Sequence, residues 1–154
     1  MTAPTGAPDR LDEPARRVAL AVVTESPLDV AEHADLVQTR AAGAVVTFAG
    51  IVRDHDHGAA VDRLVYVAHP TAARTLAEVV ADVTAAHPVD AVAVSHRIGP
   101  LAVGEVALAV AVSAAHRREA FAAAAVLVDE VKERLPVWKH QFLADGTDEW
   151  VACP

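Results

Sequence analysis

Residues 105–113 read E-V-A-L-A-V-A-V-S, an almost unbroken apolar run with the length of one strand. Strands that bury both faces have this composition, so we expect residues 105–113 to lie in the middle of a sheet covered on both sides. Residues 18–24 and 90–98 are expected to be further strands. The valine-rich residues 43–52 are predicted to form another, in which Gly50 marks a bulge or a close approach of the backbone.

Three segments carry helix signals. Residues 28–38 follow a Ser-Pro start signal, and residues 71–86 repeat apolar side chains at helical spacing after a threonine suited to capping. Residues 116–135 form the longest of the three, and Pro136 ends it.

Two hairpins are predicted from the remaining strands. Residues 61–68 alternate imperfectly and are expected to pair with residues 43–52. Residues 137–143 and 149–151 are expected to be two short strands around the turn A-D-G-T. This mixed order of hairpins and segregated helices predicts an α+β fold rather than a doubly wound parallel sheet.

The totals describe one domain of ordinary size, with 154 residues and a formal net charge of -8. We expect a flexible tail over residues 1–17 and a single domain over residues 18–154. No apolar run is long enough to cross a membrane and no signal peptide is evident, so a cytoplasmic protein is expected. An acidic chain is also not expected to bind nucleic acid or an anionic membrane. Cys153, the only cysteine, excludes an internal disulfide and argues against a catalytic thiol.

The only two lysines, Lys132 and Lys139, lie in the segment V-K-E-R-L-P-V-W-K-H at 131–140. The chain has 13 lysine and arginine residues, and all except these two are arginine. The lysine pair therefore indicates a requirement for an ammonium or an amine. The turn at Pro136 would bring the two side chains together. Two surface lysines that happen to be close are the alternative interpretation.

A helical wheel of residues 116–135 places Phe121, Ala125 and Val128 on the apolar face, flanked by Ala124, Leu127 and Val131. Arg117 falls inside that face and Lys132 at its edge. Long side chains that reach past apolar surface to water explain both cations without a function. The two cations are roughly 22 Å apart along one helix, so one small ligand cannot contact both within a chain. A site that uses both requires a dimer.

The histidines give weaker signals. His55 and His57 alternate in a loop, but no third ligand accompanies them, so we predict no metal site. His116 and Arg117 begin a helix whose free N–H groups suit an anion such as phosphate. Arg97 is expected to form a structural ion pair.

Together these motifs resemble the large, catalytic subunit of molybdopterin synthase. The similarity covers residues 18–151, and its motifs appear in the order that the family has. They are P-L-D-V at 27–30, G-A-V-V-T-F-A-G-I-V-R at 43–53, H-R-I-G at 96–99, G-E at 104–105, S-A-A-H-R at 113–117, V-K-E-R-L-P-V-W-K at 131–139 and D-G-T-D-E-W-V at 145–151.

The resemblance implies a sulfurtransferase of molybdenum cofactor biosynthesis. In that family a small ubiquitin-like partner carries sulfur as a thiocarboxylate on its C-terminal Gly-Gly tail. The large subunit binds cyclic pyranopterin monophosphate and converts it to the dithiolene of molybdopterin, without a cofactor of its own. The implied assembly is a homodimer within a heterotetramer, and the implied fold is a single α/β-hammerhead-like domain with additional antiparallel β-structure.

The family's site, carried over position by position, implies that Lys132 and Lys139 are catalytic. Lys132 is expected beside the thiocarboxylate as nucleophile or general acid/base, and Lys139 is expected to bind substrate and assist proton transfer. The implied substrate-binding residues are Ile51 and Val52 through their backbone, Arg53, His116, Arg117, Lys132, Lys139, His140 and Gln141.

Some positions depart from the family. Val65 and Val67 stand where acidic residues are common, His69 where tyrosine is common, and Gln141 where glutamate is common. Two other functions stay open from the sequence. One is a non-catalytic docking module for a ubiquitin-like sulfur carrier, and the other is a purely structural α+β dimerisation domain.

Overall fold

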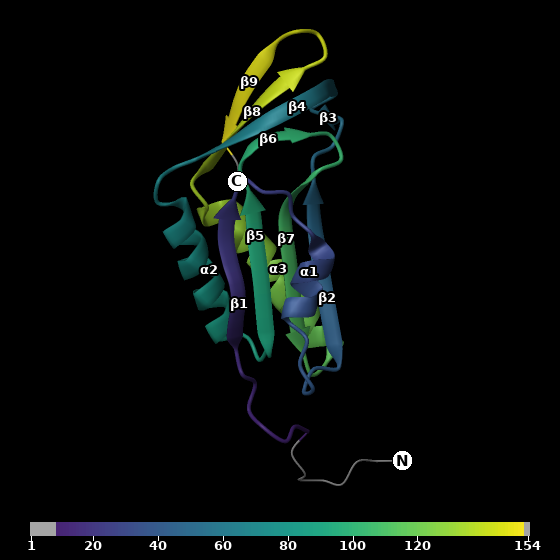
Figure 1. Cartoon of the computed structure of the whole chain (residues 1–154), viewed down its shortest axis with the longest axis vertical. Coiled ribbons are helices and arrows are strands. Elements are labelled where there is room, and N and C mark those ends of the chain that lie inside the picture. Colours follow the sequence, from purple (N-terminus) through teal and green to yellow (C-terminus); the bar gives the residue numbers. More distant parts are fainter. Residues whose placement is uncertain (1–8, 153–154) are drawn as a thin grey trace.

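The computed structural model describes residues 9–152, which form two β-sheets and three helices (Figure 1). The helices are α1 (Val30–Leu36), α2 (Ala72–Ala86) and α3 (Arg117–Arg134). The strands are β1 (Arg17–Thr24), β2 (Ala44–Ile51), β3 (His55–Asp56), β4 (Ala59–Ala68), β5 (Ala91–Arg97), β6 (Gly99–Ala102), β7 (Val106–Ala114), β8 (Val137–Leu143) and β9 (Asp148–Ala152).

The larger sheet has the strand order β1-β5-β7-β2. β7 is antiparallel to both of its neighbours, whereas β5 and β1 are parallel. α2 and α3 pack on one face of this sheet and the short α1 on the other (Figure 1). The prediction for residues 105–113 is therefore confirmed, because β7 is an interior strand buried from Ala107 to Ala114.

The two faces of this sheet bury side chains of different size. Val92, Val94, Val110 and Val112 belong to the main core, together with the buried residues of α2 and α3. The opposite face carries small side chains such as Ala93, which form a second cluster near α1. Alternation along each strand thus places most of the buried apolar volume under the two long helices.

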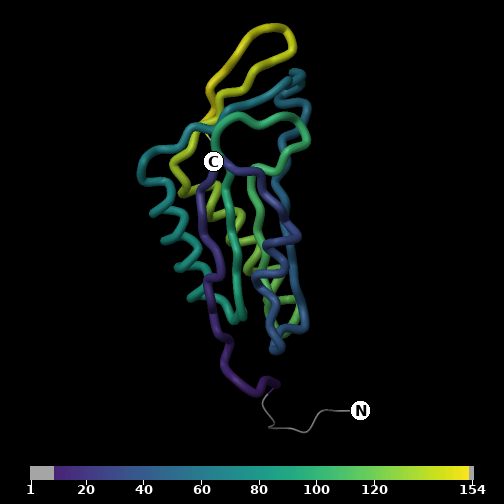
Figure 2. The backbone as a smooth tube through the Cα atoms, in the orientation of Figure 1, coloured from purple at the N-terminus to yellow at the C-terminus, as the bar shows by residue number. Residues whose placement is uncertain are grey.

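The smaller sheet lies at one end of the larger one (Figure 1 and Figure 2). Here β4 pairs with β8 and with β6, β3 pairs with β4, and β8 pairs with β9. These antiparallel pairings and the segregated helices confirm the predicted α+β class, with additional antiparallel β-structure.

The predicted hairpin between residues 43–52 and 61–68 is wrong. β2 pairs with β7 from Ala44 to Ile51, and the chain then crosses to the smaller sheet, where β4 pairs with β8. Adjacent strands usually pair, but the fully apolar β7 needs a partner on both edges. β2 provides the second partner, and the two-residue β3 takes the hairpin position beside β4.

The limits of the last helix agree with the prediction, but its buried face agrees only in part. Phe121 is 61% exposed, and the buried residues of α3 are Ala120, Ala123, Ala124, Leu127 and Val131. Alanine occurs on most sides of this helix, so hydrophobicity alone defines its inner face poorly. The small alanines instead mark where α3 approaches the sheet.

The described part of the N-terminal segment touches the domain before β1 begins. Arg10 forms an ion pair with the buried Asp90, and the backbone N–H of Arg16 donates to the carbonyl of Val89 at 3.0 Å. Residues 1–8 and the cysteine at position 153 lie outside the described residues, so the flexible tail over residues 1–17 stays a prediction. Among the described residues, no helix has the length and apolar character needed to span a membrane.

Candidate active site

The two lysines meet where the end of α3 approaches the smaller sheet. Lys132 lies in the last turn of α3, and Lys139 lies on β8, two residues after that strand begins. Pro136 stands between the two elements. The two lysines line one pocket, as the turn at Pro136 predicts.

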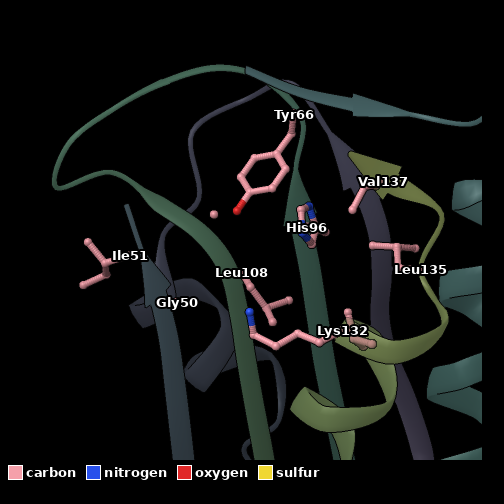
Figure 3. Close-up of a pocket in the computed structure, with 10 residues that line it drawn as sticks. Gly50, Ile51, Tyr66, His96, Leu108, Lys132, Leu135 and Val137 are labelled. Atoms are coloured by element: carbon pink, nitrogen blue, oxygen red, sulfur yellow. The ribbon is translucent and has the colours of Figure 1, made fainter. Parts of the chain in front are cut away.

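One side of this region is a pocket between the helix end and the strands (Figure 3), which we call the apolar pocket because most of its lining residues are apolar. The Lys132 side chain extends across it, and the ring of Tyr66 points into it from the smaller sheet (Figure 3). The residues that line this apolar pocket are Gly50, Ile51, Tyr66, His96, Ala107, Leu108, Val131, Lys132, Leu135 and Val137.

The other side is a polar pocket that shares Ile51, Tyr66 and Lys132 with the apolar one. The residues that line this polar pocket are Ile51, Val52, Arg53, His55, Asp56, Val61, Leu64, Tyr66, Lys132, Lys139 and Gln141. Lys132 therefore borders an apolar and a charged environment at the same time.

A bulge at the end of β2 directs this part of the chain. The register between β2 and β7 shifts between Gly50 and Ile51, which agrees with the bulge, one of the two alternatives predicted for Gly50. A Cβ atom at Gly50 would lie 3.3 Å from the Phe48 ring, so the close packing favours glycine. After the bulge the Val52 N–H donates to the carbonyl of Glu105 at 2.9 Å, so this N–H is not available to a ligand.

Asp56 is a buried carboxylate, 8% exposed, at the wall of the polar pocket. Its Oδ2 accepts a hydrogen bond from the Gln141 amide at 2.9 Å and lies 3.9 Å from Lys139 Nζ. Its Oδ1 accepts from Arg53 Nη2 at 3.3 Å. The Gln141 hydrogen bond and then the Lys139 charge lower the pKa of Asp56 below its ordinary value.

His96 is a buried histidine that lines the apolar pocket with Lys132. Burial, together with the nearby charge of Lys132, lowers the pKa of His96 to about 4, so the ring is neutral at pH 7. Its Nδ1–H donates to the carbonyl of Arg97 at 2.8 Å, which leaves Nε2 as the unprotonated nitrogen. The ring also stands edge-on to Tyr66, with 5.1 Å between centroids.

Sequence reasoning missed three residues of these pockets: Tyr66, His96 and Asp56. Available signals were the only tyrosine in the chain and a histidine in the H-R-I-G motif at the end of an apolar strand. The expected ion pair of Arg97 is present, with Glu105 as its partner.

His116 and Arg117 lie at the other end of α3 from Lys132, and both are exposed. The structure does not bring them to the two pockets within one chain. His116 instead pairs with Asp9 of the N-terminal segment. The hydrogen bond from His116 to that carboxylate, followed by its charge, raises the pKa of His116 above 6.5.

The last two predicted residues lie on opposite faces of β8. Gln141 faces the polar pocket, but it is 1% exposed and its amide donates to the carboxylates of Asp56 and Glu149. His140 points to the other face, where it pairs with Asp148 at 2.6 Å and stacks on Trp150. The structure therefore does not bring His140 to the site.

The site combines two lysine side chains, one guanidinium and a neutral imidazole beside an apolar pocket. This set can bind an anion, transfer protons and supply an amine nucleophile. Among residues 9–152, no group of three or more histidine, cysteine, aspartate or glutamate side chains is placed to hold a metal ion.

Residues 23–134 match the family model described as MoaE protein. The molybdopterin synthase catalytic subunit of Nostoc is 39% identical over 132 residues, which cover 84% of this chain and 80% of that protein. Catalytic subunit 1 of Mycobacterium tuberculosis is 39% identical over 130 residues, with coverages of 84% and 88%.

The chain is also similar to solved structures of such proteins. The molybdopterin synthase of Staphylococcus aureus has a TM-score of 0.79 at 30% identity, and the match covers 85% of this chain and 96% of that one. The MoaE protein of Burkholderia ambifaria has a TM-score of 0.74 at 28% identity, with coverages of 88% and 91%.

Proposed function

Because the chain belongs to the MoaE family of molybdopterin synthase catalytic subunits, we propose that it transfers sulfur to cyclic pyranopterin monophosphate from a small ubiquitin-like partner. The sulfur arrives as a thiocarboxylate on the C-terminal Gly-Gly tail of that partner. The product is the dithiolene of molybdopterin, so the chain is a sulfurtransferase of molybdenum cofactor biosynthesis that acts in the cytoplasm.

The observation that carries this proposal is the position of Lys132 between the two pockets. The apolar pocket suits the partner's tail, because glycines have no side chains and pass through a narrow space. The polar pocket suits the anionic pterin, because Arg53 and Lys139 supply positive charge there. Lys132 then stands where the sulfur donor meets the acceptor.

The chemistry proposed for each lysine is the one that the family resemblance implies. We assign Lys132, beside the thiocarboxylate, the role of nucleophile or general acid/base. Lys139 binds the substrate and assists proton transfer. Within residues 9–152 Lys132 has no hydrogen bond or ion pair with a carboxylate, whereas Lys139 faces Asp56, so the two amines differ in their environment.

His116 and Arg117 join the site from a second subunit in this proposal. They cannot reach Lys132 along their own helix, and they lie at the opposite end of α3. A two-fold homodimer, at the centre of a heterotetramer with two sulfur carriers, lets the start of one α3 meet the end of the other. The exposed imidazole and guanidinium then complete the anion site.

The test is reconstitution. The purified chain is mixed with a thiocarboxylated carrier and with cyclic pyranopterin monophosphate, and dithiolene formation is followed. The carrier with an ordinary C-terminal carboxylate is the control and should give no product. A docking module without catalysis would bind both forms of the carrier and form no dithiolene with either, which would overturn the proposal.

A further inference from the structure

We propose that Asp56 is a positioning residue, whose buried carboxylate holds Lys139 and Arg53 in the orientation that the polar pocket needs. The inference rests on the proposed function, because it assigns Asp56 a role in the same site. The Asp56 carboxylate places a negative charge in a pocket that is proposed to bind an anion. Because this charge repels the ligand, its presence requires an explanation.

Each carboxylate oxygen of Asp56 faces one of the two cations. Oδ2 lies 3.9 Å from Lys139 Nζ, and Oδ1 lies 3.3 Å from Arg53 Nη2. His57 Nε2 also lies 3.6 Å from Oδ1, but its side chain is 90% exposed. The carboxylate is thus an anchor for two long, flexible side chains, which would otherwise sample many rotamers.

A hydrogen bond from a buried side chain holds the Asp56 carboxylate in place. Gln141 is 1% exposed, and its amide donates to Asp56 Oδ2 at 2.9 Å and also to Glu149. Gln141 therefore links Asp56 to β8, the strand that carries Lys139. A buried hydrogen bond of this kind fixes the orientation of the carboxylate plane.

The backbone around Asp56 is also fixed. β3 and β4 form a hairpin in which His55 pairs with Ala60 and Asp56 with Ala59. The two turn residues between them, His57 and Gly58, have φ values of 46° and 79°, as a type I′ turn requires. This tight turn directs the Asp56 side chain inward and the His55 side chain to solvent.

The two effects of the Asp56 charge on the reaction have opposite signs. Removing the charge makes the pocket more positive, so binding of the anionic pterin should not weaken. It also releases Lys139 and Arg53 from their anchor, so the reacting groups lose their alignment. We therefore expect Asp56→Asn to lower kcat about tenfold or more while KM for the pterin stays the same or falls.

A matched control is available two residues away. Asp54→Asn removes the same charge from the same loop, but the Asp54 side chain is 78% exposed and pairs with His55. Its kcat and KM should both remain within about twofold of the unmodified chain. Asp56→Glu keeps the carboxylate and should recover part of the lost kcat.

A second measurement does not depend on catalysis. Because the chain has only two lysines, lysine labelled with ¹³C at Cε gives two NMR signals, and Lys132→Arg identifies which one belongs to Lys139. Asp56→Asn should move the Lys139 signal and leave that of Lys132 in place, while Asp54→Asn should move neither. Circular dichroism and thermal unfolding confirm that each variant is folded.

The outcomes separate the inference from the proposed function. If the unmodified chain forms dithiolene but Asp56→Asn keeps its kcat within twofold, the positioning role is overturned whatever happens to KM. If the unmodified chain forms no dithiolene, the proposed function fails, and the NMR signals still test the anchor. A Lys139 signal that does not move in folded Asp56→Asn protein overturns the inference on its own.

Discussion

Lys139 on β8 is the cross-strand neighbour of Tyr66 on β4, and both side chains line the polar pocket. This pairing fixes which residues of β8 face the site, because side chains alternate along a strand. A register slip of one residue would replace Lys139 by Trp138 or His140. The pairing of β4 with β8 is therefore part of what builds the site.

Lys139→Ala tests this assignment. We expect the rate of dithiolene formation to fall by about 100-fold or more, the range found for a group that transfers protons in the transition state. His140→Ala is the matched control, since His140 is the next residue but lies on the other face of β8. It should keep turnover within about threefold, and an equal loss in both variants would contradict the assignment.

Lys132 is expected to require an amine and not only a positive charge. Lys132→Ala should reduce turnover by about 100-fold or more, and Lys132→Arg should not restore it, because a guanidinium is neither a nucleophile nor a base at neutral pH. Single-turnover assays with the thiocarboxylated carrier measure the loss. Full turnover in Lys132→Ala would show that the chemistry lies elsewhere.

His116 should titrate with a raised pKa, because its hydrogen bond to Asp9 favours the imidazolium. The pair is complete at low pH and is lost as the pH rises through the raised pKa of His116. In Asp9→Asn the pKa of His116 should therefore fall toward 6.5, which a histidine NMR titration measures. An unchanged midpoint would show that the two side chains do not interact in solution.

His96 should behave in the opposite way. With a pKa of about 4 its ring stays neutral when the pH falls from 7 to 5, whereas a histidine in the unfolded chain takes up a proton near 6.5. The unfolded state thus binds more protons in this window, so the stability from His96 decreases as the pH is lowered. The same NMR titration should show no midpoint for His96 above about pH 5.

Much of the fold follows from the sequence, because strong local patterns agree with the tertiary structure. The apolar run at residues 105–113 predicts an interior strand, and Pro136 predicts the end of the last helix; both predictions are confirmed. The pairing of the strands is harder to predict from local patterns. β2 and β4 are neighbours in sequence yet belong to different sheets, and no local signal distinguishes that arrangement from a hairpin.

The site could be predicted only in part for a related reason. Lys132 and Lys139 stand out because lysine is rare in this chain, and a proline turn shows how they meet. Asp56 is one of many acidic residues in sequence, and only the β3–β4 hairpin distinguishes it from the exposed Asp54. Asp56 is buried through contacts such as its hydrogen bond with Gln141, which is 85 positions away in sequence.

Stability measurements can check which face of α3 is buried. Leu127 is fully buried, so Leu127→Ala should lower the free energy of unfolding by about 2–5 kcal/mol. Phe121→Ala removes a larger side chain that is 61% exposed, and it should cost less than about 1 kcal/mol. Urea unfolding of both variants compares the two values, and a larger cost for Phe121 would restore the helix face expected from the wheel.

We expect each active site to use residues from both subunits of the dimer. If the proposed shared site is correct, Arg117→Ala and Lys132→Ala should each inactivate the homodimer, because each removes one required residue from both sites. A mixed dimer contains one chain of each variant. One of its two sites then lacks both residues and the other has both, so half of its sites are intact. Random exchange of subunits makes half of the dimers mixed, so activity should recover to about one quarter of the unmodified level. Turnover is measured before and after the two variants are mixed and allowed to exchange. If activity does not recover although mass spectrometry detects mixed dimers, then Arg117 and Lys132 do not serve a common site.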